Sequence, residues 1–111
     1  MSKIIVINSE TMGRGNDELG KKILGSFFRK IGFQTGKPDA IIFYNSSVKL
    51  LAKGSPFLSD LEILEKSGVD LIACGTCVGY FNLEDKIVAG RVSNMQEIAQ
   101  MLMNTESVVT L

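Results

Sequence analysis

Val69-Asp70-Leu71-Ile72-Ala73-Cys74 is an apolar run that ends in Gly75-Thr76-Cys77, after which Val78-Gly79-Tyr80-Phe81 begins an amphipathic stretch. This order is typical of a buried strand, a tight turn and the start of a helix. Strands of parallel sheets are apolar throughout because they are buried on both faces. In open α/β sheets, ligand and reaction sites lie just beyond the carboxyl ends of the strands. The segment therefore predicts an α/β fold whose site includes both cysteines of the chain.

Further apolar runs of strand length alternate with helical patterns along the chain. We expect strands at residues 3–8, 40–44, 69–74 and 108–111, and a weaker, glycine-interrupted strand at residues 87–92. We expect helices at residues 17–31, from 45 to 52, from 56 to 66 after a Ser55 cap, behind the cysteine turn, and up to Met103. The last helix has two alternative capping boxes, Ser93 with Gln96 and Asn94 with Glu97. Together these patterns predict a three-layer α/β/α sandwich with a mostly parallel sheet of about five strands and helices on both faces.

The composition limits the class of protein. A chain of 111 residues forms one domain, residues 1–111, because two smaller domains would each lack a sufficient core. Twelve basic and twelve acidic residues give no net charge, and no segment combines basic with aromatic residues, so we expect no nucleic-acid partner. No run approaches the roughly 18 apolar residues of a membrane span, so we expect no membrane contact. We also expect no secretory signal, which together with the few cysteines predicts a cytoplasmic protein.

The chain contains no histidine, and this excludes several kinds of chemistry. It removes Ser-His-Asp and Cys-His catalysis, and it removes the commonest ligand of transition metals. Two cysteines cannot complete a closed structural zinc site within one chain. We therefore expect no metal and no cofactor, and any reaction at this site has to use the thiols themselves.

Cys74 and Cys77 are the candidate catalytic residues. A thiol at a helix N-terminus has its pKa lowered by the helix dipole and by free backbone N–H groups, and the start of the helix decides which of the two thiols this concerns. We expect Cys74 to be partly accessible at the carboxyl edge of the sheet, with Cys77 close enough to react with it. The alternative is structural: free cysteine is often a small core residue, which would leave Cys77 incidental.

Loops that follow the first two strands should reach the same edge of the sheet as Cys74. They contribute polar side chains, and the first loop also contributes the acidic Glu10 and the basic Arg14. The candidates to line a thiol site are Asn8, Glu10, Arg14, Asn45, Gly75 and Thr76. The alternatives are turn glycines in the first loop, where the spacings of phosphate-binding motifs are absent, and plain helix capping at Asn45.

Four stretches of the chain together resemble a known family. They are Ile7-Asn8-Ser9-Glu10-Thr11-Met12-Gly13-Arg14-Gly15, Phe43-Tyr44-Asn45-Ser46, Ala73-Cys74-Gly75-Thr76-Cys77 and Gly90-Arg91-Val92-Ser93-Asn94-Met95. In this order they resemble the DsrE/DsrF-like family of sulfur-relay proteins. The resemblance is closest to the C-terminal domain of YedF-type proteins, which are sulfurtransferase-like and linked to selenium metabolism.

This resemblance implies a small α/β/α domain that forms trimers or hexamers. In the sulfur-relay members, a cysteine at the end of a central strand carries a persulfide; Cys74 matches that cysteine, and Cys77 matches an addition of the YedF-like group. Full-length YedF-type proteins carry an N-terminal TusA-like domain, so the resemblance implies either a separate TusA-like sulfur carrier as a partner or a standalone relative. A net charge of zero, with apolar surface from Phe57, Phe81 and the methionines, also favours a homo-oligomer.

The leading hypothesis is a sulfur or selenium transfer protein. Cys74 would accept sulfane sulfur as a persulfide, and Cys77 could then release the outer atom and leave a disulfide. An alternative from another class is a non-catalytic oligomeric subunit, regulatory or binding, with redox-sensitive thiols. A third is a dithiol oxidoreductase, which the absence of a proline-bearing thioredoxin-like context disfavours.

Overall fold

The computed structural model describes residues 2–111, and its centre is a sheet of five parallel strands. The strands are β1 (Lys3–Ile7), β2 (Ala40–Phe43), β3 (Asp70–Cys74), β4 (Arg91–Ser93) and β5 (Ser107–Thr110). Their order across the sheet is β4-β3-β2-β1-β5. The strands predicted at 3–8, 40–44, 69–74 and 108–111 agree with these bounds to within one residue, and the predicted parallel α/β sheet is confirmed.

The connecting helices follow their capping residues. They are α1 (Asp17–Ile31), the 3₁₀ helix η1 (Asn45–Leu51), α2 (Leu58–Lys66), α3 (Gly75–Tyr80) and α4 (Met95–Asn104). α1 has the predicted bounds because Asn16 caps it, accepting a hydrogen bond from the backbone N–H of Leu19 at 2.8 Å. α2 begins later than predicted, because Pro56 and Phe57 form a turn before it. None of the helices within residues 2–111 is long and apolar enough to cross a membrane.

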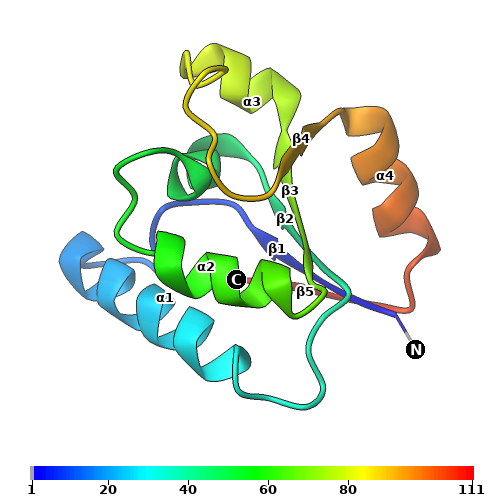
Figure 1. Ribbon diagram of the computed structural model, residues 1–111, viewed down its shortest axis with the longest axis horizontal. Coiled ribbons are helices and arrows are strands. Elements are labelled where there is room, and N and C mark those ends of the chain that lie inside the picture. The colour runs from blue at the N-terminus through cyan, green and yellow to red at the C-terminus, as the bar shows by residue number, and fades with distance from the viewer. Residues whose placement is uncertain (1) are drawn as a thin grey trace.

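Helices cover both faces of the sheet, as predicted, with α1 and α2 on one side and α4 on the other (Figure 1). Successive residues of a strand point to opposite faces, so β1, β2 and β3 each contribute to two apolar clusters. The larger cluster joins alternate strand residues such as Ile5, Ile41 and Leu71 to Leu24 and Phe28 of α1. The smaller cluster joins Ile4, Val6, Ala40, Ile42, Ile72 and Cys74 to Ile98 of α4.

The weak strand predicted at residues 87–92 is the least accurate part of the prediction. Only Arg91–Ser93 joins the sheet, while Ile87 forms an isolated antiparallel bridge with Ala52. Between them Gly90 adopts a φ of 70°, and a Cβ at this position would lie 2.6 Å from the carbonyl oxygen of Leu71. The chain needs glycine here to turn and to approach β3, so the apolar run is divided into two separate segments.

Ser47 holds η1 against the ends of β1 and β2. Its side chain is completely buried, and its hydroxyl lies within hydrogen-bond distance of the carbonyl oxygens of Ile7 and Tyr44. Leaving a buried acceptor unpaired costs roughly 1–3 kcal/mol, so this contact fixes where η1 begins. Asn45, the first residue of η1, is thereby held close to the end of β1.

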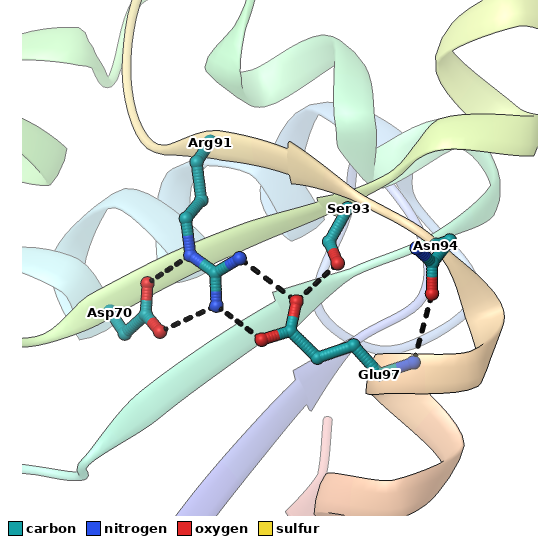
Figure 2. Close-up of polar contacts among 5 residues, drawn as sticks. All are labelled: Asp70, Arg91, Ser93, Asn94 and Glu97. Atoms are coloured by element: carbon teal, nitrogen blue, oxygen red, sulfur yellow. Dashed lines mark hydrogen bonds and ion pairs between the residues drawn. The ribbon is translucent and has the colours of Figure 1, made fainter.

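Arg91 joins β3, β4 and α4 (Figure 2). Its guanidinium donates two hydrogen bonds to Asp70, both at 2.9 Å, and two to Glu97, at 2.8 and 2.9 Å. Glu97 also accepts a hydrogen bond from the hydroxyl of Ser93, and its backbone N–H donates to Oδ1 of Asn94 at 2.9 Å. Of the two predicted capping boxes, Asn94 therefore supplies the cap, but the Glu97 side chain turns to Arg91 and Ser93 instead of completing the box.

The ion pairs orient α4, and apolar packing supplies most of its stability. The side chains of Arg91, Asp70 and Glu97 remain 39% to 44% accessible, so water and salt screen their attraction. Burying the side chain of Ile98 stabilises the fold by about 1.5–3 kcal/mol. The hydrogen bonds from Arg91 and then from Ser93 nevertheless lower the pKa of Glu97 to about 2.

Replacing Glu97 with glutamine should remove an acid-dependent part of the stability. The folded pKa is lowered to about 2 from 4.5, so this contribution is complete above pH 4.5 and is lost as the pH falls from 4.5 towards 2. Denaturant titrations should show Glu97→Gln to be less stable than the wild type at neutral pH, with the two converging towards pH 2. Glu62→Gln, on the exposed side of α2, is the matched control and should follow the wild type. A difference that is the same at every pH would contradict the prediction.

Candidate functional site

The carboxyl ends of all five strands lie at one edge of the sheet, because all pairings are parallel. In the ladder, Ile7 of β1 pairs with Phe43 of β2, and Phe43 pairs with Ala73 of β3. The residues that follow them are Asn8, Tyr44 and Cys74, the last of which still belongs to β3. The prediction that the loops after β1 and β2 reach the same edge as Cys74 is therefore confirmed.

Cys74 is buried, contrary to the expectation that it would be partly accessible. It is the last residue of β3, and only 2% of its surface is exposed. β3 lies between β2 and β4, and the side chain of Cys74 points to the face that α4 covers, where it joins the cluster of Ile98. The strand position that was expected to present this thiol therefore places it in the core.

Cys77 is the more accessible of the two thiols. It lies in α3, is half-buried and contacts both apolar clusters at the end of the sheet. Both cysteines are free thiols, and Cys74 lies close enough to Cys77 to raise the pKa of its thiol. The site therefore holds two thiols, which we call the inner thiol (Cys74) and the outer thiol (Cys77).

Asn45 provides a hydrogen bond to the outer thiol. Its backbone N–H lies 3.1 Å from Sγ of Cys77 and donates to it. Asn45 has a φ of 56°, in the left-handed region that asparagine tolerates better than most residues. The hydrogen bond from Asn45, the first residue of η1, links the segment after β2 to α3.

The electrostatic surroundings disfavour ionisation of Cys77. Burial raises the pKa of its thiol, the hydrogen bond from Asn45 lowers it, and Cys74 raises it further. Because α3 begins directly after Cys74, the lowering predicted at the helix start does not concern Cys77. At Cys77 the loss of hydration outweighs the favourable hydrogen bond.

Cys77 opens into a pocket of 410 Å³, here called the thiol pocket. Its lining residues are Asn45, Thr76, Cys77, Tyr80 and Phe81. Tyr80 and Phe81 follow Cys77 by three and four positions, the spacing that places side chains on one face of a helix. Tyr80 is 80% exposed and packs edge-to-face against Phe81, with ring centroids 5.3 Å apart. Tyr80 and Phe81 form the aromatic wall of the pocket, and their spacing from Cys77 is the signal in the sequence that points to it.

The other predicted lining residues separate into different surroundings. Asn8 and Arg14 line a second cavity, which adjoins the thiol pocket at Asn45. Glu10 forms an ion pair with Lys49 at 3.6 Å and does not line the thiol pocket. Lys49 also lies 4.5 Å from the ring centroid of Phe81, so it is the basic residue that contacts the aromatic wall. Lys49 was not among the predicted site residues.

Gly75 has a structural reason to be glycine. A Cβ at this position would lie 2.7 Å from the carbonyl oxygen of Ser93, at the end of β4. Its missing side chain lets the turn between β3 and α3 pack against β4. Across residues 2–111, no group of three or more acidic, cysteine or histidine side chains is placed to hold a metal ion.

Comparison with known proteins gives a family and a fold. A model of the DsrE/DsrF-like family matches residues 1–111, which is the whole chain. No curated protein matches the chain. The ychN protein from E. coli is 16% identical, with a TM-score of 0.70 and 100% of both chains covered. A protein of unknown function from Methanobacterium thermoautotrophicum, MTH1491, is 17% identical, with a TM-score of 0.72 and 100% of both chains covered.

A third similar structure is the conserved protein of unknown function BT1422 from Bacteroides thetaiotaomicron. It is 19% identical, with a TM-score of 0.70, and the match covers 99% of this chain and 95% of that one. At these identities the three structures show a common fold, and they agree with the α/β architecture predicted from the sequence.

Alkylation should distinguish the two thiols. In the folded protein we expect iodoacetamide to label Cys77 but not Cys74, because Cys74 is buried. Labelling of Cys77 at neutral pH should be slower than that of a free thiol and should accelerate as the pH rises, because burial raises its pKa. Mass spectrometry of Cys74→Ser and Cys77→Ser measures each thiol separately, and labelling in denaturant is the control in which both should react alike. Rapid labelling of Cys74 in the folded Cys77→Ser variant would contradict this assignment.

Proposed function

This chain belongs to the DsrE/DsrF-like family, and from that premise we propose that it is a sulfur-relay protein that carries sulfur as a persulfide on the thiol pair at the end of β3. The observation that carries the proposal is the arrangement of the two free thiols. Cys77 opens into the thiol pocket and packs against the buried cluster that contains Cys74. Thiols are the nucleophiles of sulfur exchange, and this pair lies where open α/β sheets place their sites.

Burial favours Cys77 as the first acceptor of sulfur. The resemblance to sulfur-relay proteins assigns the persulfide to the position of Cys74, but a donor can reach only the thiol that is exposed. In the forward step, the Cys77 thiolate attacks the outer sulfur of a donor persulfide. The sulfur–sulfur bond of the donor breaks, a Cys77 persulfide forms, and the donor leaves as a thiolate.

Cys74 provides a second step. Its thiolate can attack the inner sulfur of the Cys77 persulfide, which forms a Cys74–Cys77 disulfide and releases the outer atom as hydrosulfide. When an acceptor thiolate attacks the outer sulfur instead, the sulfur passes to that acceptor and Cys77 is regenerated as a thiolate. Formation of the disulfide stops sulfur transfer until a thiol reductant restores both thiols. Transfer to the acceptor is the relay reaction.

The raised pKa of Cys77 suits a carrier more than a general oxidoreductase. A small thiolate fraction at neutral pH slows reaction with adventitious electrophiles. The thiolate that does form is a stronger nucleophile than that of an acidic thiol, because intrinsic nucleophilicity falls with pKa. Transfer then depends on a donor that is held next to the thiol.

Self-association is part of the proposal. Phe57 and Phe81, expected to supply apolar surface, pack partly against the larger cluster instead. Met95 of α4 is 50% exposed and Met103 is 83% exposed, so α4 offers apolar surface to a second copy, as do exposed apolar side chains elsewhere such as Phe33 and Ile63. The trimer or hexamer, the YedF-type relationship, a selenium role, the TusA-like carrier and the cytoplasmic location stay predictions.

Incubation with inorganic polysulfide should place one additional sulfur atom on Cys77. In intact-mass measurements, Cys74→Ser should retain this sulfur longer than the wild type, because the thiol that can displace it is absent. The wild type should show a mixture of persulfide and internal disulfide.

The matched variant Cys77→Ser should remain unmodified while it is folded, because Cys74 is buried. Sulfur on Cys74 in this variant would reverse the proposed order of the two thiols. If neither variant nor the wild type takes up sulfur, the transfer function fails, and a non-catalytic subunit with redox-sensitive thiols becomes the better explanation.

A further inference from the structure

A cavity of 660 Å³ adjoins the thiol pocket; we call it the Arg14 cavity. The residues that give it its chemistry are Asn8, Ser9, Thr11, Arg14, Tyr44 and Asn45. Pockets of about 300–1,000 Å³ are the usual size of small-molecule sites in proteins. The volume is therefore large enough for a ligand of amino-acid to tripeptide size, and larger than an inorganic anion needs.

The position of the Arg14 cavity in the sheet is one that open α/β folds use for ligands. The chain builds β1 to β4 in one direction across the sheet and then returns through α4 to add β5 on the other side of β1. The strand order thus reverses between β1 and β5, and ligands in such sheets bind outside the carboxyl ends of the strands at this reversal. Asn8 follows β1 and Leu111 follows β5, and both line the cavity.

The lining of the Arg14 cavity favours an anionic ligand. Arg14 is the charged side chain of the lining, and the other polar groups are amides and hydroxyls. Asp17 and Glu18, in the first turn of α1, are not among the lining residues. The ion pairs within residues 2–111 involve Lys49 and Arg91, which leaves the guanidinium of Arg14 available. A guanidinium binds a carboxylate through two parallel hydrogen bonds.

The loop that carries Arg14 has a defined shape. Gly13 and Gly15, on either side of Arg14, have φ values of 83° and 127°, which disfavour other residues. The backbone N–H of Met12 donates to the carbonyl oxygen of Gly20 in α1 at 3.1 Å. A Cβ on Gly20 would lie 2.7 Å from the Cβ of Thr11, so the loop packs directly on α1. A site held in this way loses less entropy when a ligand binds.

Asn45 connects the Arg14 cavity to the outer thiol. It lines both the Arg14 cavity and the thiol pocket, and its backbone N–H donates to Sγ of Cys77 at 3.1 Å. A ligand that extends from Arg14 past Asn45 therefore reaches the sulfur of Cys77.

We propose that the Arg14 cavity binds the sulfur donor, a carboxylate-bearing low-molecular-weight thiol in its persulfide form, with the carboxylate on Arg14 and the sulfur directed to Cys77. This inference rests on the proposed sulfur-relay function. In the step, the Cys77 thiolate attacks the outer sulfur of the donor R–S–SH. The donor's S–S bond breaks, the Cys77 persulfide forms, and R–S⁻ leaves and takes up the proton that Cys77 released. No external oxidant or reductant is required.

Binding can be tested without sulfur transfer by using S-methylglutathione, which has carboxylates but no reactive sulfur. In NMR titrations of the full chain, we expect it to shift the backbone amide signals of Asn8, Tyr44 and Asn45. Arg14→Gln should weaken its binding about tenfold, the loss expected when a hydrogen bond to a charged group is removed. The same peptide with its carboxylates esterified should bind weakly and equally to both proteins. Arg29→Gln, an exposed arginine at the other end of α1, is the matched control and should bind like the wild type.

The outcomes separate this inference from the proposed function. If S-methylglutathione does not bind, or binds Arg14→Gln as tightly as the wild type, the inference is overturned, even if polysulfide still modifies Cys77. Transfer from a protein persulfide, without any binding of the peptide, overturns it as well. If the peptide binds through Arg14 and glutathione persulfide modifies Cys77 about tenfold more slowly in Arg14→Gln than in the wild type and in Arg29→Gln, the inference is supported. If the peptide binds but no donor modifies Cys77, the relay function fails, and with it the donor role of the cavity.

Discussion

Parallel, in-register pairing of β1, β2 and β3 is the constraint on which the rest of the structure depends. Because Ile7, Phe43 and Ala73 form one row of the ladder, the three loops that follow them must leave the sheet together. Apolar side chains on both faces of these strands hold this row in place. The thiol pair, the hydrogen bond from Asn45 and the Arg14 cavity all lie at the edge that this pairing creates.

The architecture could be predicted from the sequence because each buried strand is a continuous apolar run. The parallel order then followed from the helices between the runs, and it brought the loops after β1 and β2 to the cysteines. The segment 87–92 was misread because periodicity does not show that Gly90 has to turn against the backbone of β3. Apolar character marks what is buried, but it does not specify where a chain bends.

The roles of the two thiols were beyond the reach of the sequence for a related reason. Cys74 ends a strand, and whether its side chain is exposed depends on which face it points to and on which helix covers that face. That requires the placement of α4, some twenty residues further along the chain. Likewise, Arg14 could be assigned to the correct edge, but the separation of the Arg14 cavity from the thiol pocket depends on the conformation of Asn45.

The two faces of the sheet differ in how they are covered, and this has a consequence for Cys74. One face is covered by α1, α2 and η1, whereas α4 is the main cover of the cluster that contains Cys74 and Ile98, with Tyr44 and Cys77 also packed against it. We expect α4 to open before the helices of the opposite layer, with protection from hydrogen exchange lost there first, because regions with few buried contacts open at lower free energy. Such an opening would uncover the inner thiol without unfolding the strand that bears it. We therefore expect the reactivity of Cys74 to follow the lifetime of its contact with α4.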